Sequence, residues 1–199
     1  MVVSALRWRF VTLDGMDART IPKFKGRNTG KKNPHECFSA EKKKQILLLA
    51  ATNPWTDLAV HILFDLGSRV QDLADIRWYQ ITLVIGELHE GCARVKLNAL
   101  KTTAREGVLT RGTVQLLKER REELHEEWAS DSRIMGVSNP NYLRQRIVKF
   151  FAKGGIKIHT HSFRKTVITE LYRETKDIKA VADYIGHAST KTTQGYIEN

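Results

Sequence analysis

Apolar and polar positions follow a helical period through most of the chain after residue 39. Apolar residues that recur three or four positions apart predict an amphipathic helix. In the first half of this region we predict three helices, over residues 40–52, 56–67 and 68–78. Ser39 is a favourable N-cap for the first helix, Asn53–Pro54 interrupts it, and Gly67 is placed to end the second in a left-handed conformation.

The pattern changes between residues 80 and 111 to short runs rich in β-branched side chains. The segments QITLVIG, CARVKLN and EGVLTR are separated by the polar stretches ELHEG and KTTAR. Short strands at this spacing are typical of hairpins. We therefore expect one small three-stranded antiparallel sheet.

Helical periodicity returns after the predicted strands. The expected helices cover residues 112–128, 141–155, 161–175, 177–187 and 189–199. Asp177 and Ser189 are expected N-caps, and Gly186 is expected to end the helix before it. Because the strands form one insertion among helices, the predicted fold class is α+β, mainly α-helical, and not a parallel α/β fold.

The first 34 residues are predicted to form a short helix followed by a basic linker. Residues 1–18 are too short for a domain, and residues 19–34 contain six basic side chains and no acidic one. Two interpretations of this linker remain open: a solvated loop, or a strap that lies along phosphate groups. We divide the chain into residues 1–34 and a larger unit over residues 35–199.

The charge of the chain favours a polyanionic partner. Lys and Arg number 33 against 22 Asp and Glu, which gives a formal net charge of +11 over 199 residues.

Cys37 and Cys92 show neither a disulfide framework nor metal-ligand spacing, which fits a reducing intracellular setting. No apolar run approaches the ~20 residues that span a bilayer, and the start lacks the apolar region of a signal peptide. We expect no membrane partner.

Four places bring cationic, imidazole or phenolic side chains to the ends of predicted elements. They are Arg69 after Gly67–Ser68, Lys101 between the last two strands, His161 with Arg164, and His187 with Tyr196. His161 and Arg164 are three residues apart, so they share one helix face. Each feature alone is more often an ordinary surface or turn residue than part of a site. Their combination is more specific, with 23 positions from Arg164 to His187 and nine from His187 to Tyr196.

Together these segments resemble the tyrosine recombinase (phage integrase) family. FDLGSRVQDLADIRW is similar to the family's first arginine box, in which Asp72 follows Arg69 by three residues. LKTTAREGVLT is similar to its β-hairpin lysine segment, and HTHSFRKTVITEL to its His-x-x-Arg box. VADYIGHASTKTTQGY is similar to its Leu-Gly-His…Tyr box, with Ile185 where leucine is usual. The resemblance covers about residues 38–199 and implies an integrase-like catalytic domain.

The resemblance implies metal-independent cleavage and rejoining of DNA through a 3′-phosphotyrosyl intermediate. The implied catalytic residues are Arg69, Lys101, His161, Arg164, His187 and the nucleophile Tyr196. Two guanidiniums suit the non-bridging oxygens of a phosphodiester, whose negative charge grows in the transition state. A tyrosine, with an unperturbed pKa of about 10, needs a nearby base. The candidate base is His161, the candidate acid for the departing 5′ oxygen is Lys101, and the candidate phosphate ligand is His187.

Neither a cofactor nor a metal is expected. The sequence contains no GxxxxGK[ST] phosphate loop and no clustered carboxylates for two-metal catalysis. The implied partner is double-stranded DNA, on which we expect a homo-oligomer, a tetrameric synapse if the protein is a complete recombinase. The expected location is intracellular, with DNA.

Three functions are compatible with the resemblance. The leading one is site-specific DNA recombination or integration. The alternatives are a type IB topoisomerase-like nicking and closing activity, and a truncated recombinase that acts only as a DNA-binding module. Residues 1–34 are either the remnant of the core-binding domain with which family members clamp DNA, or all that precedes the catalytic region. Only three residues follow Tyr196, which weakens the expectation of a tetramer.

Overall fold

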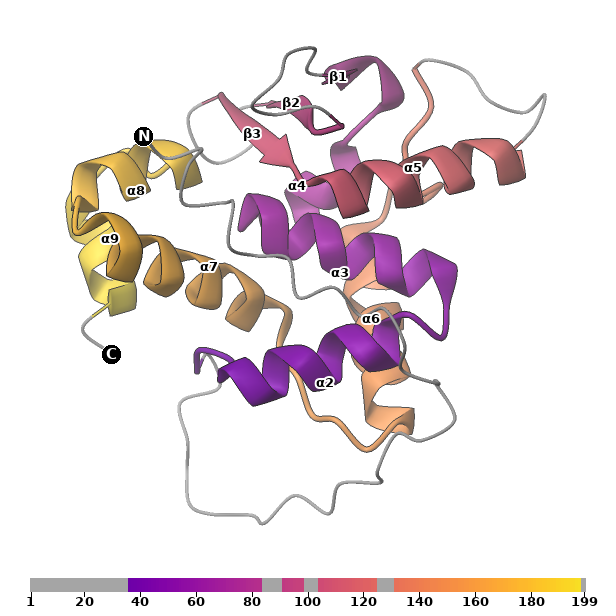
Figure 1. Cartoon of the computed structure of the whole chain (residues 1–199), viewed down its shortest axis with the longest axis horizontal. Helices are drawn as coiled ribbons and strands as arrows, with labels where there is room; N and C mark the ends of the chain where they lie inside the picture. The colour runs from indigo at the N-terminus through magenta and orange to yellow at the C-terminus, as the bar shows by residue number, and fades with distance from the viewer. Residues whose placement is uncertain (1–35, 84–90, 99–103, 125–130, 198–199) are drawn as a thin grey trace.

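A computed structural model of the chain describes residues 36–83, 91–98, 104–124 and 131–197. The helices are α2 (Ala40–Ala50), α3 (Pro54–Leu66), α4 (Val70–Asp75), the 3-10 helix η3 (Trp78–Gln80), α5 (Arg111–Leu124), α6 (Pro140–Lys153), α7 (Thr160–Thr175), α8 (Ile178–Ile185) and α9 (Thr190–Ile197). The strands are β1 (Ile81–Leu83), β2 (Ala93–Leu97) and β3 (Arg105–Leu109). The predicted α+β fold is confirmed, while the helix and linker predicted for residues 1–34 lie outside the described residues (Figure 1).

The sheet is antiparallel, with strand order β1-β2-β3. On β2, Ala93, Val95 and Leu97 are buried while the residues between them are exposed, as strand alternation requires. Gly107 on β3 lies against the end of α3, because a Cβ built on it would fall 2.4 Å from Leu66 Cδ2. The sheet therefore packs directly on the C-terminal end of α3.

The predicted third helix, over residues 68–78, is shorter than expected. Residues 69 and 76 both have extended backbones, so α4 is confined to Val70–Asp75. The carbonyl of Ile76 accepts a hydrogen bond from Ile134 N at 3.0 Å, and residues 77 and 133 form a β-bridge. Pairing with this distant segment replaces the helical hydrogen bonds that the local pattern predicts.

The second predicted helix starts earlier than residue 56. The side chain of Asn53 accepts a hydrogen bond from Thr56 N at 2.9 Å, and Pro54 occupies the first turn, where its missing N–H costs nothing. Asn53–Pro54 therefore begins α3 as well as separating it from α2. The cap predicted at Ser39 is confirmed, because its hydroxyl accepts from Lys42 N at 3.2 Å.

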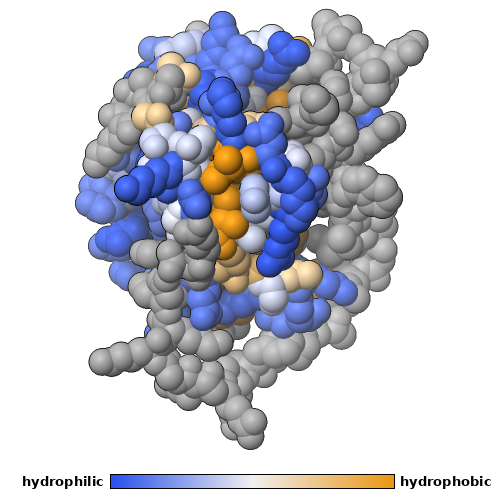
Figure 2. All heavy atoms as spheres, turned by 90° about the vertical axis from the view of Figure 1, so that its left-hand side faces the viewer, coloured by the Kyte–Doolittle hydropathy of each residue, from blue (hydrophilic) through white to orange (hydrophobic). Residues whose placement is uncertain are grey.

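Helix α3 lies at the centre of the core and packs against α2, α5, α7 and β3 (Figure 1). Phe64 of α3 meets Phe163 of α7 edge to face at 4.8 Å between ring centroids, and Phe38 joins them at 5.1 Å from Phe163. Among the described residues no helix has the length and apolar character to cross a membrane. Helices α8 and α9 lie to one side of the core, and this side is mainly hydrophilic around a narrow apolar strip (Figure 2).

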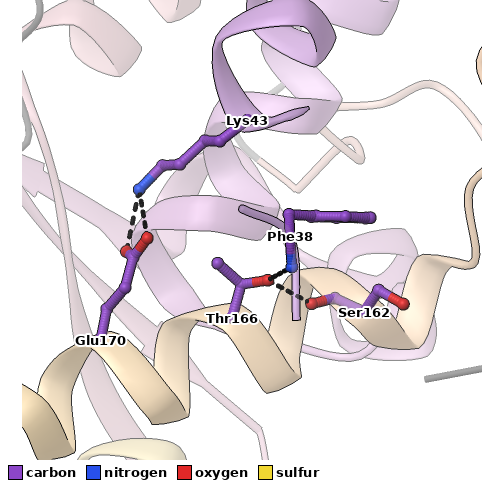
Figure 3. A network of polar contacts seen from close by, with 5 residues as sticks. All are labelled: Phe38, Lys43, Ser162, Thr166 and Glu170. Carbon is purple, nitrogen blue, oxygen red and sulfur yellow. Dashed lines mark hydrogen bonds and ion pairs between the residues drawn. The ribbon is translucent and has the colours of Figure 1, made fainter. Parts of the chain in front are cut away.

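Polar contacts fix α7 to the start of α2 (Figure 3). The hydroxyl of Thr166 accepts from Phe38 N at 2.8 Å and donates to the carbonyl of Ser162 at 2.8 Å. One turn further on, Lys43 and Glu170 form an ion pair at 2.8 Å. Helix α7, which carries two of the predicted site residues, is therefore tied on this side by hydrogen bonds as well as by aromatic packing.

Gly67 ends α3 at a point where the core leaves no space for a side chain. Its φ of 54° is left-handed, and its N–H donates to Leu63 O at 3.0 Å. A Cβ built on it would lie 2.6 Å from Ile185 Cδ1 and 2.9 Å from Val167 Cγ1. The position therefore requires glycine for both conformation and space.

We predict that Gly67→Ala lowers the free energy of unfolding by about 2 kcal/mol or more, because it adds backbone strain to overpacking. The matched control is Gly195→Ala on α9, where a Cβ meets nothing within 4 Å. That substitution should raise stability by about 0.5–1 kcal/mol, since alanine is the better helix former. Urea unfolding followed by circular dichroism measures both changes. Equal effects of the two substitutions would contradict the role given to Gly67.

Candidate active site

Arg164, in the second turn of α7, is only 1% exposed. Its guanidinium donates to Gly67 O at 2.8 Å and to Ile185 O at 3.1 Å. These carbonyls lie at the C-terminal ends of α3 and α8, and each helix is ended by a left-handed glycine, Gly67 or Gly186. Helix ends leave carbonyls without helical partners and carry partial negative charge, which suits a guanidinium. Arg164 therefore holds two turns together.

Burial, followed by repulsion from Arg69 and Arg105, lowers the pKa of Arg164 to about 10. The side chain remains a cation at neutral pH, since that value is well above 7. A buried cation whose hydrogen bonds go to neutral carbonyls keeps its charge available to a ligand.

Arg69 lies in the turn that Arg164 holds, between Gly67 and the start of α4. Its backbone N–H donates to the carboxylate of Asp72 at 2.9 Å, and Asp72 is buried in the first turn of α4. This bond fixes the direction in which the chain leaves α3. An acidic residue three positions after Arg69 therefore stabilises the turn by accepting this hydrogen bond.

His187 follows Gly186 at the end of α8 and is buried. Its backbone N–H donates to Ala182 O at 2.9 Å, and its Nδ1 is 2.8 Å from the hydroxyl of Thr193 on α9. Burial, then repulsion from Arg164 and Arg69, lowers the pKa of His187 to about 4. The imidazole is therefore neutral at pH 7.

Tyr196, on α9, reaches the first turn of α7. Its hydroxyl is 2.6 Å from Nε2 of His161. The ring of Tyr196 also stacks on the imidazole of His187, with centroids 5.5 Å apart and planes 29° apart. The phenol is therefore bracketed by two imidazoles, one of which can accept its proton.

Three buried nitrogens with no hydrogen-bond partner among the described residues lie in this cluster: Nη1 of Arg69, Nε of Arg164 and Nε2 of His187. Nε of Arg120 and Nε of Arg133 are in the same state outside it. Buried donors are nearly always satisfied, because leaving one unpaired costs about 1–3 kcal/mol. Several unpaired donors in one place indicate a site for an anion with several acceptor oxygens. No group of three or more His, Cys, Asp or Glu that could hold a metal ion occurs in the described part of the chain.

Five of the six residues predicted from the sequence come together here: Arg69, His161, Arg164, His187 and Tyr196. The sixth, Lys101, lies outside the described residues.

Two contributors were not predicted. Thr193 orients the imidazole of His187, and Arg105 of β3 donates to Leu66 O at 2.9 Å and to Tyr184 O. Strand alternation could have indicated Arg105, since it shares the inward-facing register of Gly107 and Leu109, where a cation is unusual.

Comparisons with known proteins agree with this geometry. The phage integrase family matches residues 38–199. No curated protein gives a significant match to this sequence. Among solved structures, the XerA recombinase superposes with a TM-score of 0.66 at 23% identity, covering 84% of this chain and 62% of that one.

Two further structures show the same fold. The XerH recombinase, in a post-cleavage complex with its palindromic difH substrate, gives a TM-score of 0.66 at 19% identity, over 83% of this chain and 50% of that one. A lambda integrase dimer bound to a core site gives a TM-score of 0.58 at 18% identity, covering 84% of this chain and 49% of that one. This chain thus spans about half to three-fifths of the length of these proteins. The match over residues 38–199 shows that the chain belongs to the phage integrase family, the tyrosine recombinases.

Proposed function

We propose that this protein cuts and rejoins a strand of double-stranded DNA through a covalent link to Tyr196, and so acts in site-specific recombination or integration. The observation that carries the proposal is the set of unpaired buried donors on Arg69, Arg164 and His187. They lie beside Tyr196, whose hydroxyl is hydrogen-bonded to His161. A phosphodiester supplies the oxygens that such donors need. Membership of the family points to the same reaction.

The proposed first step is an in-line displacement at phosphorus. The hydroxyl oxygen of Tyr196 attacks and passes its proton to Nε2 of His161, while the bond from phosphorus to the 5′ oxygen breaks. Arg69 and Arg164 stabilise the charge that builds on the non-bridging oxygens. His187 is neutral, so it donates through Nε2–H when Nδ1 accepts from Thr193.

The departing 5′ oxygen needs a proton, and we assign its donation to Lys101. The product is a 3′-phosphotyrosyl ester and a free 5′ hydroxyl. Because one phosphate ester replaces another, attack by a 5′ hydroxyl from a second strand can reverse the step without an external energy source. Rejoining to a different strand is then recombination.

We propose that residues 35–199 form the catalytic unit and that it works as a homo-oligomer on DNA, with a tetramer as the complete synapse. Support comes from the solved relatives, among which are a lambda integrase dimer on a core site and the Tn1549 transposon integrase on circular intermediate DNA. As a strap, the basic linker over residues 19–34 would add contacts to the DNA backbone.

We predict that Tyr196→Phe abolishes a covalent protein–DNA adduct, because the attacking oxygen is removed. The substrate is a pool of nicked duplexes with randomised sequence, so that a cut strand loses its 5′ fragment and the adduct accumulates. Denaturing gels detect the adduct, and mass spectrometry of digested adduct identifies the modified tyrosine. Tyr142→Phe, a change on an exposed tyrosine of α6, is the matched control and should leave the adduct intact. An adduct that persists in Tyr196→Phe would remove this tyrosine as the nucleophile.

We predict that the low pKa of His187 makes the fold less stable in mild acid. In the unfolded chain the imidazole has a pKa of about 6.5, against about 4 when folded. The unfolded state therefore binds more protons between these values, so the free energy of unfolding rises from pH 4 to pH 6.5 and this contribution is constant above.

Urea unfolding at several pH values measures this slope. His187→Asn should make the slope shallower than in the unmodified protein. Identical slopes in the two proteins would mean that His187 is not held neutral by the fold.

We predict that affinity for duplex DNA falls steeply with salt. A chain of net charge +11 that neutralises several phosphates releases their counterions on binding. Between 50 and 200 mM salt, a loss of about 10³-fold or more in affinity is expected for six or more phosphate contacts. Fluorescence anisotropy of a labelled duplex measures it. An affinity that does not change with salt would argue against DNA as the partner.

A further inference from the structure

Arg105 makes hydrogen bonds like those of Arg164, to neighbouring carbonyls at the same two helix ends, but from a different element. Arg164 donates to the carbonyls of Gly67 and Ile185. Arg105, at the start of β3, donates to the carbonyls of the residues immediately before them, Leu66 and Tyr184. Two guanidiniums, one from α7 and one from the sheet, therefore bridge the same two helix ends.

The burial of Arg105 costs free energy of desolvation, which is hard to explain if the residue only stabilises the fold. Its hydrogen bonds go to two carbonyls, its guanidinium lies 5.8 Å from the ring of Tyr184, and no carboxylate pairs with it among the described residues. Burial is the main cause of a lowered pKa for Arg105; Tyr184 and the carboxylate of Asp72 oppose it, and the nearby cation Arg69 adds to it. An apolar side chain of similar length would pack here without that penalty. A cation kept beside other cations points to an anion that all of them share.

The contacts of Arg105 also determine how far apart the two site turns lie. The turn after α3 leads within three residues of Leu66 to Arg69, and the turn after α8 leads from Tyr184 to His187. Tyr184 is itself fixed, since its hydroxyl donates to Asp65 O at 2.7 Å. Movement of either helix end would change the spacing between the unpaired nitrogens of Arg69 and His187.

We propose that Arg105 is a positioning residue of the phosphate site: it joins the ends of α3 and α8 so that Arg69, Arg164 and His187 face one phosphate. This inference rests on the proposed function, because it takes the bound anion to be a phosphate of DNA. Its role is separate from that of Arg164, since Arg105 comes from β3 and couples the sheet to the site.

The test measures anion binding and DNA cleavage separately. The variants are Arg105→Lys, which keeps the charge but cannot bridge two carbonyls with a planar fork, and Arg105→Met, which keeps neither. Arg94→Met, at an outward-facing arginine on the neighbouring strand β2, is the matched control. Each protein is first shown to be folded by circular dichroism, at a temperature well below its unfolding transition.

Anion binding is measured as the rise in Tm with inorganic phosphate, against chloride at the same ionic strength. We expect a rise in the unmodified protein and in Arg94→Met, and a loss of at least tenfold in phosphate affinity in both Arg105 variants. Single-turnover adduct formation on nicked DNA should slow at least tenfold in the same two variants, at saturating DNA. If Arg105→Met does not fold, the phosphate affinity and the rate of adduct formation of Arg105→Lys alone test the inference.

Arg105 variants that respond to phosphate and cleave within about threefold of the unmodified protein would overturn the inference. Retention of both properties by Arg105→Lys alone would also overturn it, since charge without bridging would then suffice. An unmodified protein that shows no phosphate-dependent rise would overturn it as well. A phosphate response that depends on Arg105, in a protein that never forms a DNA adduct, would support this inference while rejecting the proposed function.

Discussion

The hydrogen bonds from the buried guanidinium of Arg164 to the ends of α3 and α8 are the interaction on which the site depends. Arg69 and His187 follow those two ends by a few residues, so the position of each is determined by a main-chain carbonyl that Arg164 holds. Desolvation of Arg164 is expensive, and the carbonyls of two helix ends offset part of that cost. A bound phosphate would offset more of it.

The rest of the molecule keeps α7, and with it Arg164, in place. Phe163 packs against the rings of Phe38 and Phe64 in the core. Along the same face of α7, Thr166 accepts the N–H of Phe38, and Glu170 pairs with Lys43. Aromatic packing is tolerant of small rotations, while hydrogen bonds to a defined atom are not. The two together restrict both the position and the rotation of the helix that presents His161 and Arg164.

The sequence predicts this fold well where the decisive interactions are local. The caps at Ser39, Asp177 and Gly186 are determined by neighbouring residues, and the structure has each of them. Prediction was wrong where a distant segment competes: α4 stops short because the chain at Ile76 pairs with Ile134.

The candidate site follows the same division. The resemblance of four short segments to the tyrosine recombinases predicted Arg69, His161, Arg164, His187 and Tyr196, whose hydrogen bonds and charges the structure brings into one cluster. Arg105 was not predicted: alternation along β3 places it on the inward face, but its partners are main-chain carbonyls of other elements, which the sequence does not identify. Thr193 was missed for a related reason, since only the turn between α8 and α9 brings its hydroxyl to His187.

The use of main-chain carbonyls as partners has a consequence for how this site can change during evolution. A carbonyl is present whatever the side chain, so positions 66, 184 and 185 can vary without losing a main-chain hydrogen bond to either arginine, whereas position 67 is restricted to glycine. What restrains position 185 is instead the space beside Gly67, where the isoleucine Cδ1 occupies the volume that a Cβ would need. An isoleucine where the family usually has leucine is thus a change in packing alone. Drift at these positions should be limited by the shape of the core and not by the chemistry that it supports.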